Sequence, residues 1–189
     1  MTKGFKRTRT GRITARFDQT ERDVLTMLAT QLFEIVQPPT AKHADPLAVE
    51  LGLEDLDTAV DVAAMGMLEQ RDPVVDRLFP AAYEDEAAAM EFRRFTELGL
   101  RQQKAANVQV MLDTLAESGD KVTLSAAQAL AWLAAFNDLR LALAVRLGIE
   151  TEADHERIDL LDDEEVVATY NLYQVLTFLQ DTLVQALDR

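Results

Sequence analysis

The chain has 189 residues, a formal net charge of −14 and no cysteine. This length is sufficient for one domain with a buried core, and the lack of thiols excludes disulfides, thiol redox switches, cysteine nucleophiles and thiolate zinc sites. No run approaches the ~20 apolar residues of a membrane span, and the basic N-terminus lacks the apolar segment of a signal peptide. These features predict a cytoplasmic protein that has no membrane partner.

Charge is distributed unevenly along the chain. Residues 1–16 contain six lysines and arginines and no acid, so they carry +6, and the total of −14 leaves −20 for residues 17–189. An acidic body repels nucleic acid. Any contact with DNA must therefore come through a local basic feature.

The N-terminal segment 5–17, FKRTRTGRITARF, predicts a β-hairpin. Its second half alternates apolar and polar side chains, and Thr10-Gly11 is a candidate two-residue turn. Because like charges directly opposite each other repel, the basic face of this hairpin requires an anionic partner. That partner is either DNA phosphate, since two-stranded ribbons can enter DNA grooves, or the protein's own acidic surface. The predicted register places four arginines on this face, namely Arg7, Arg9, Arg12 and Arg16.

Helix signals follow the hairpin. Asp18 and Glu21 form a capping box for a helix over residues 19–37, which Pro38 ends. A short β-prone segment at residues 121–124 could add a third strand to the hairpin. The acidic stretch 150–165 predicts a solvated loop with some helical turns. Further helices are predicted at residues 47–53, 56–70, 73–78, 85–118 and 164–187.

The long region 85–118 admits two interpretations because Gly99 either kinks it or divides it. A helix-turn-helix over residues 92–111 would bring several cations together. Glutamates dilute that charge, and a continuous helix explains the pattern equally well. The cations concerned are Arg93, Arg94, Arg101 and Lys104.

The stretch 126–147 predicts a central helix around which the rest of the chain packs. Ser125 and Gln128 supply a capping box, and Gly148 supplies a C-terminal stop. A helix this apolar is largely buried. Its expected core face contains Leu130, Leu133, Phe136, Leu143, Ala144 and Leu147.

Two polar residues, Asn137 and Arg140, fall inside that expected core face. A buried arginine needs a carboxylate or several carbonyls, so we expect Arg140 to meet an acid from another helix, such as Asp181 or Glu34. The pair is either the centre of a functional pocket or part of a buried ion pair that fixes helix register.

The inventory for catalysis and metal binding is small. The chain has two histidines, His43 and His155, and two serines, both better explained as helix ends. One Glu-x-x-His motif ends at His155, but His43 lacks the matching glutamate that a helical di-metal site requires. Neither GxGxxG nor a Walker motif occurs. We therefore predict no catalytic residue, no metal and no cofactor.

Three segments carry a family resemblance: DPVVDRLFPAAY at 72–83, AWLAAFNDLRLALAVRLGI at 131–149 and YNLYQVLTFLQDTLVQAL at 170–187. Together with the N-terminal hairpin segment they resemble the AosR-like family, and residues 137–140 and the pair Tyr173-Gln174 are the most specific parts. This family was formerly described as a domain of unknown function and is associated with transcriptional regulation in oxidative stress. Its redox-sensing hypothesis depends on a cysteine pair that this chain lacks.

These observations predict one mainly α-helical domain over residues 1–189, with a β-hairpin at 5–17 and a helical bundle at 18–189. The resemblance implies a non-enzymatic transcriptional or stress-response regulator without thiol sensing, and the hairpin arginines would contact DNA. The alternative is a protein-interaction or adaptor module that binds another regulatory protein or forms a homodimer. An enzyme or metal protein would need a pocket that gathers Arg140, Asn137 and a carboxylate or His155.

Overall fold

The computed structural model describes residues 3–38, 72–80, 86–117 and 119–188. These residues form six helices and one three-stranded antiparallel sheet, which confirms the predicted mainly α fold. The fold divides into two compact units, residues 1–34 with 106–189, and residues 35–105. The helices predicted at 47–53 and 56–70 lie outside the described residues, and the single domain stays a prediction.

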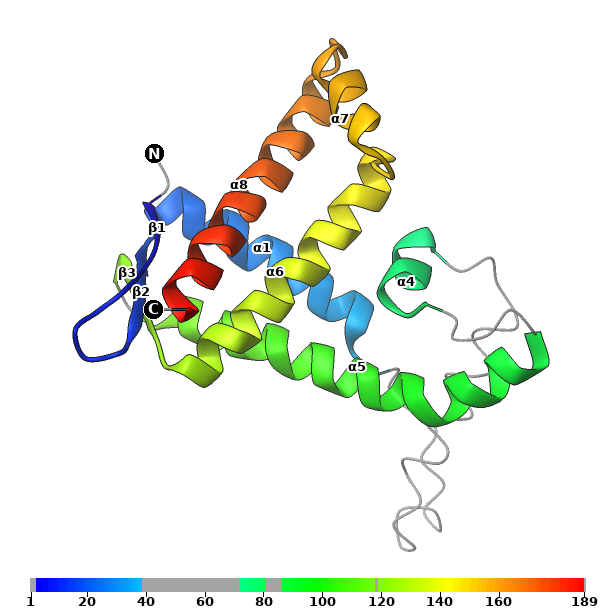
Figure 1. Ribbon diagram of the computed structural model, residues 1–189, viewed down its shortest axis with the longest axis horizontal. Coiled ribbons are helices and arrows are strands. Elements are labelled where there is room, and N and C mark those ends of the chain that lie inside the picture. The colour runs from blue at the N-terminus through cyan, green and yellow to red at the C-terminus, as the bar shows by residue number, and fades with distance from the viewer. Residues whose placement is uncertain (1–2, 39–71, 81–85, 118, 189) are drawn as a thin grey trace, which may run out of the picture. The chain divides into compact units, whose positions relative to one another are not determined.

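The sheet contains the predicted hairpin and the predicted third strand. Its order is β1 (Lys3–Arg7), β2 (Ile13–Arg16) and β3 (Lys121–Leu124), with both pairs antiparallel (Figure 1). The third strand provides a backbone partner for β2 and removes one exposed edge, which a lone hairpin would leave unpaired.

The predicted hairpin register was wrong. Arg7 lies opposite Ile13 and Lys6 opposite Thr14, so the connection is a five-residue loop and not a two-residue turn. The physical reason lies in Thr8, whose backbone N–H donates to the Arg12 carbonyl at 2.7 Å and whose Oγ1 accepts from the Arg12 N–H at 3.1 Å. These bonds pair Arg12 with Thr8, whereas a Thr10-Gly11 turn would pair Arg12 with Arg9, so the register shifts by one residue.

The helix α1 (Gln19–Val36) begins at the capping box that the sequence predicted. The Glu21 N–H donates to Asp18 Oδ1, and the Asp18 N–H donates to Glu21 Oε2, both at 2.9 Å. Two of the backbone donors at the helix start are therefore satisfied by side chains.

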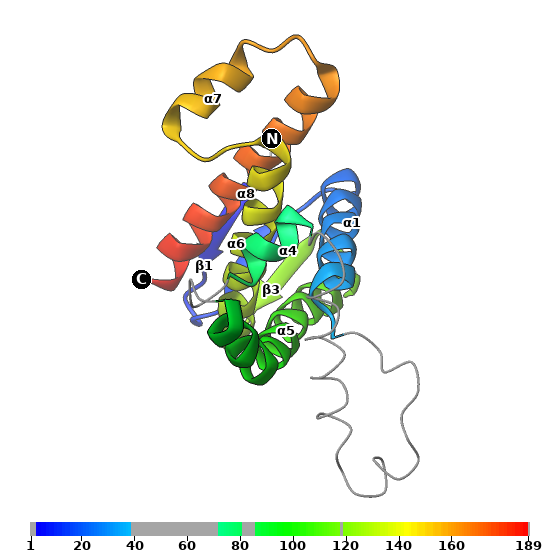
Figure 2. The ribbon, with the colours of Figure 1, turned by 90° about the vertical axis from the view of Figure 1, so that its right-hand side faces the viewer.

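The central helix α6 (Ala126–Leu147) has its predicted ends, because Ser125 and Gln128 form the capping box and Gly148 adopts a left-handed conformation at φ 64°. It runs beside α8 (Glu164–Leu187), and α7 (Glu152–Asp159) lies in the connection between them (Figures 1 and 2). The prediction of its core face was partly wrong. Leu130 is 57% exposed, whereas Trp132, expected at the edge, is fully buried.

The core of the first unit is an aromatic cluster between the sheet and α6. Neighbouring ring centroids within the cluster lie 5.5–6.2 Å apart, and Phe17 stacks on Trp132 with an interplanar angle of 10°. The Trp132 indole N–H donates to Thr114 Oγ1 at 2.8 Å, so its polar atom is satisfied. The cluster consists of Phe5, Phe17, Trp132 and Phe136.

The second unit contains α4 (Pro73–Leu78) and the first part of α5 (Glu86–Ala116), which also contributes its last turns to the first unit. The helix α5 is continuous through Gly99, so the helix-turn-helix interpretation is wrong. The Arg101 guanidinium pairs with the buried Glu97 at 2.9 Å and lies 4.4 Å from the Phe79 ring centroid. In the described ranges, no helix combines the length and apolar content that a membrane crossing requires.

Candidate functional site

The two faces of the sheet differ sharply in composition. Side chains alternate between faces along β2 and β3, and in β1 a register shift between Lys3 and Lys6 places Lys3 on the same face as its partner Arg16. The inner face is apolar and buried against the aromatic cluster. The outer face carries only cations and threonines. Its members are Lys3, Lys6, Thr14, Arg16, Lys121 and Thr123.

The register arranges this outer face in two rows. Arg16 lies between Lys3 and Lys121, so three cations occur side by side on adjacent strands. Asp120, directly before β3, pairs with Arg16 at 2.9 Å, but both side chains are more than 60% exposed. An exposed pair of this kind contributes about 0–1 kcal/mol, so an anionic ligand can compete for Arg16.

The structure separates the four predicted arginines. Arg16 lies on the outer face, and Arg9 and Arg12 are exposed in the loop between β1 and β2. Arg7 has the opposite orientation, because its guanidinium donates to the Leu187 carbonyl at the end of α8 at 3.3 Å. The lysines of the outer face were missed by sequence reasoning. The predicted third strand, through Lys121, was the signal that could have revealed them.

Arg140 does not meet the acid that the sequence predicted. Its guanidinium donates to Gln180 Oε1 at 2.7 Å and to the Tyr173 hydroxyl at 3.2 Å, and it lies 5.2 Å from the Tyr173 ring centroid. The Arg140 side chain is only half-buried, so its charge does not need a carboxylate. The Gln180 amide, the Tyr173 hydroxyl and the Tyr173 ring face stabilise it instead. Asn137 is exposed and does not join it, whereas the next residue, Asp138, is buried.

A second hydrogen-bonded group continues from Arg140 towards α7. Tyr173 stacks on Tyr170 with centroids 6.2 Å apart, and the Tyr170 hydroxyl meets His155 Nδ1 at 3.0 Å and the Gln174 amide at 2.7 Å. We call this set the α7-end cluster, and it consists of Arg140, His155, Tyr170, Tyr173, Gln174 and Gln180. No metal-binding group of three or more His, Asp or Glu side chains occurs in the described part of the chain.

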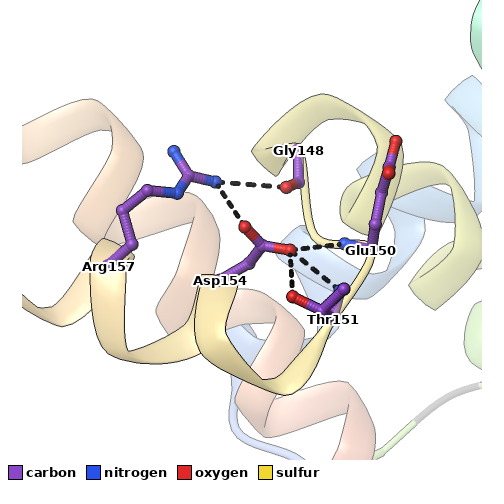
Figure 3. Close-up of polar contacts among 5 residues, drawn as sticks. All are labelled: Gly148, Glu150, Thr151, Asp154 and Arg157. Carbon is purple, nitrogen blue, oxygen red and sulfur yellow. Dashed lines mark hydrogen bonds and ion pairs between the residues drawn. The ribbon is translucent and has the colours of Figure 1, made fainter.

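The junction between α6 and α7 is fixed by one carboxylate (Figure 3). Asp154 Oδ2 accepts from the Thr151 N–H at 2.8 Å, the Glu150 N–H at 3.0 Å and the Thr151 hydroxyl at 2.9 Å. These bonds, with the Thr151 N–H first, and the Arg157 charge lower the pKa of Asp154 to about 2. Arg157 also donates to the Gly148 carbonyl at 3.1 Å, so it links the two helix ends.

Comparison with known proteins identifies the family. A family model described as "Domain of unknown function (DUF2017)" matches residues 2–187. The chain belongs to this family. The match includes the basic sheet, α6 and the α7-end cluster.

The named relatives of this DUF2017 chain are mycobacterial. Proteins of Mycobacterium tuberculosis and Mycobacterium bovis, named oxidative stress regulator AosR, are 34% identical over 130 residues, which cover 61% of this chain and 58% of each relative. A Mycobacterium leprae protein, provisionally given the same name, is 34% identical over 149 residues, which cover 71% of this chain and 67% of the relative. No solved structure matches.

This DUF2017 member therefore resembles proteins named as regulators, and its sequence has no cysteine. A switch that forms a disulfide cannot operate within the chain.

Proposed function

We propose that this DUF2017 protein regulates transcription in a stress response and contacts DNA through the outer face of its N-terminal sheet. The names of the relatives support the regulatory role. The observation that carries the DNA contact is the row Lys3, Arg16 and Lys121, which gathers three cations on adjacent strands of a chain with a net charge of −14.

The chemistry of this surface suits a phosphate backbone. Lysine and arginine neutralise phosphates, and threonine hydroxyls donate hydrogen bonds to phosphate oxygens. The exposed loop residues Arg9 and Arg12 extend the cationic surface beyond the strands. A β-ribbon that carries such side chains can enter a DNA groove.

The fold also gives this surface a rigid support. The inner side chains of the same strands, including Phe5, Ile13 and Val122, are buried against the core. The cations therefore project from a sheet whose backbone is fixed before DNA arrives, which lowers the ordering cost of binding. The acidic remainder of the chain disfavours nonspecific contacts elsewhere.

Fluorescence anisotropy with duplex DNA across a salt series tests this proposal. The test variant is Lys3→Ala with Lys121→Ala, because both side chains are exposed and belong to the row on the outer face. The control is Arg77→Ala with Arg146→Ala, which removes the same charge from exposed positions on α4 and α6. Arg7 stays unchanged because it bonds the end of α8.

The unaltered protein should bind with an affinity that falls steeply as salt rises. Loss of two phosphate contacts should reduce the slope of log affinity against log salt by roughly 1.8 in the test variant, whereas the control should keep the full slope. An absence of binding at low salt would contradict the proposal and favour a protein-interaction module. Equal losses in the two variants would show that the sheet is not the contact surface.

A further inference from the structure

An apolar groove lies between α1 and α8 in the first compact unit. Its volume is about 170 Å³, and apart from Thr20 and Glu21 every side chain that lines it is apolar. The residues that matter below are Phe17, Leu25, Leu172, Val175 and Leu176. Such a groove is of the size that accepts one aromatic ring, since an engineered cavity of about 150 Å³ binds benzene.

The α8 surface beside this groove lacks charge. No charged residue occurs between Glu165 and Asp181, although 28% of the whole chain is charged. Val175 lines the groove and is 38% exposed, and Phe178, one turn further along α8, is 45% exposed. Depletion of charge around exposed aromatic and aliphatic side chains is typical of the centre of a protein interface.

We propose that this surface binds a second copy of the same chain, with α8 packed antiparallel against α8. A two-fold axis near Val175 places Phe178 of each copy opposite Leu172 of the other, because both lie three residues from Val175. The ring of Phe178 then enters the groove of the facing copy. The same helix supplies both the projecting ring and the groove, as a self-complementary two-fold contact requires.

The distribution of charge favours α8, over the other surfaces of the chain, as the place where two copies meet. Two chains with a net charge of −14 each repel one another, and this repulsion is smallest where the contact surface is uncharged. The α8 stretch meets that condition, and the basic sheet, which repels its own copy, does not. The one charged side chain that lines the groove is Glu21 of α1, and its carboxylate accepts the Asp18 N–H. The inference is independent of DNA binding, so it can fail or succeed separately from the proposed function.

Two matched substitutions on α8 provide the test. Val175→Glu places a charge in the proposed interface, and Val184→Glu is the control. Both valines are 38% exposed, and nine residues, or two and a half helical turns, place them on opposite sides of α8. Sedimentation equilibrium of the full chain across a micromolar concentration series should give a dimer for the unaltered protein and for Val184→Glu, and a folded monomer for Val175→Glu.

Cross-linking supplies a second measurement that does not depend on inserting a charge. Because the chain has no cysteine, a single introduced thiol can pair only with its own copy. Val175→Cys, next to the two-fold axis, should form a covalent dimer under mild oxidation, and Val184→Cys should remain a monomer.

Three results would overturn the inference. The unaltered chain could be a monomer throughout the series, or Val184→Glu could dissociate as readily as Val175→Glu. Alternatively, the unaltered chain could be a monomer that binds an apolar dye, and Val175→Glu could lose this binding. The groove would then be a binding site for a small apolar ligand.

Discussion

The two ends of the α6–α8 pair differ in how much of their contact is aromatic packing and how much is hydrogen bonding. At the sheet end, four aromatic rings come from β1, from α6 and from Phe17 between β2 and α1. Their centroids lie 5.5–6.2 Å from those of their neighbours, and the rings are almost fully buried. At the other end, Leu147, Ile158 and Tyr170 form a smaller buried apolar cluster, and the α7-end cluster adds hydrogen bonds between polar side chains. Along α6, the change from aromatic packing at Phe136 to polar pairing at Arg140 takes four residues, or about one helical turn.

This difference indicates which end of the α6–α8 pair tolerates structural change less well. Close-packed rings leave no room for altered geometry, so the sheet end fixes the position of the basic outer face. A polar cluster contributes less stability, because each hydrogen bond replaces one made with water. Its directional bonds instead select one register between α6 and α8.

The largest effect of a substitution on the free energy of unfolding is expected at the sheet end. Phe136→Ala removes a fully buried ring that lies 5.5 Å from Trp132, and it should lower the free energy of unfolding by about 3–5 kcal/mol. Urea unfolding followed by circular dichroism measures this loss. The single tryptophan should also emit at longer wavelength as its surroundings loosen. A loss below about 1 kcal/mol would contradict the close packing.

A smaller loss of folding stability is expected for a substitution where β1 contacts α8. A Cβ added at Gly4 would lie 2.5–2.7 Å from three atoms of Thr182, the residue whose hydroxyl accepts the Phe5 N–H. Gly4→Ala should therefore cost about 1–3 kcal/mol through overpacking. The control is Gly99→Ala, since nothing lies within 4 Å of that position in α5, and alanine there should stabilise the helix by roughly 0.5–1 kcal/mol. If both variants melted at the same temperature, the β1–α8 contact would not be tight.

Sequence reasoning succeeded where the signal is local. The capping boxes at Asp18 and Ser125, the stop at Gly148 and the bounds of α8 each depend on a few neighbouring residues, and all were predicted correctly. The caps work through hydrogen bonds between residues three apart, so the sequence contains the whole interaction.

Sequence reasoning failed where burial, strand register or side-chain partners depend on segments that are distant in the chain. Leu130 was expected inside and Trp132 at the edge, because helical periodicity alone cannot show which elements cover a helix that is apolar on nearly every side. The hairpin register depends on Thr8, whose bonds to Arg12 compete with the predicted turn. The partners of Arg140 come from α8, 33 and 40 residues further along the chain.

A modest effect is expected in the α7-end cluster. Arg140→Met should lower the free energy of unfolding by about 1 kcal/mol, because the lost hydrogen bonds are partly offset by removal of a buried Nε that has no partner. A double-mutant cycle with Tyr173→Phe should give a coupling energy of at least about 0.5 kcal/mol. A loss as large as that of Phe136→Ala would show that both ends depend equally on their contacts.

The smallest effect concerns the α6–α7 junction and depends on pH. The carboxylate of Asp154 has a folded-state pKa of about 2, below its ordinary value of 3.8, so its charged form favours the folded state. This contribution is complete above pH 4 and is lost as the pH falls through about 2.

Asp154→Asn should accordingly melt slightly below the unaltered protein at neutral pH, and the difference should shrink as the pH approaches 2. Asp162→Asn, at an exposed position in the same connection, controls for the change in net charge. A melting difference that stays constant over this pH range would mean that the hydrogen bonds to Thr151 and Glu150 do not depend on the carboxylate charge. The α6–α7 junction would then depend, like the sheet end, on contacts that pH does not change, such as the packing of Leu147 against Ile158.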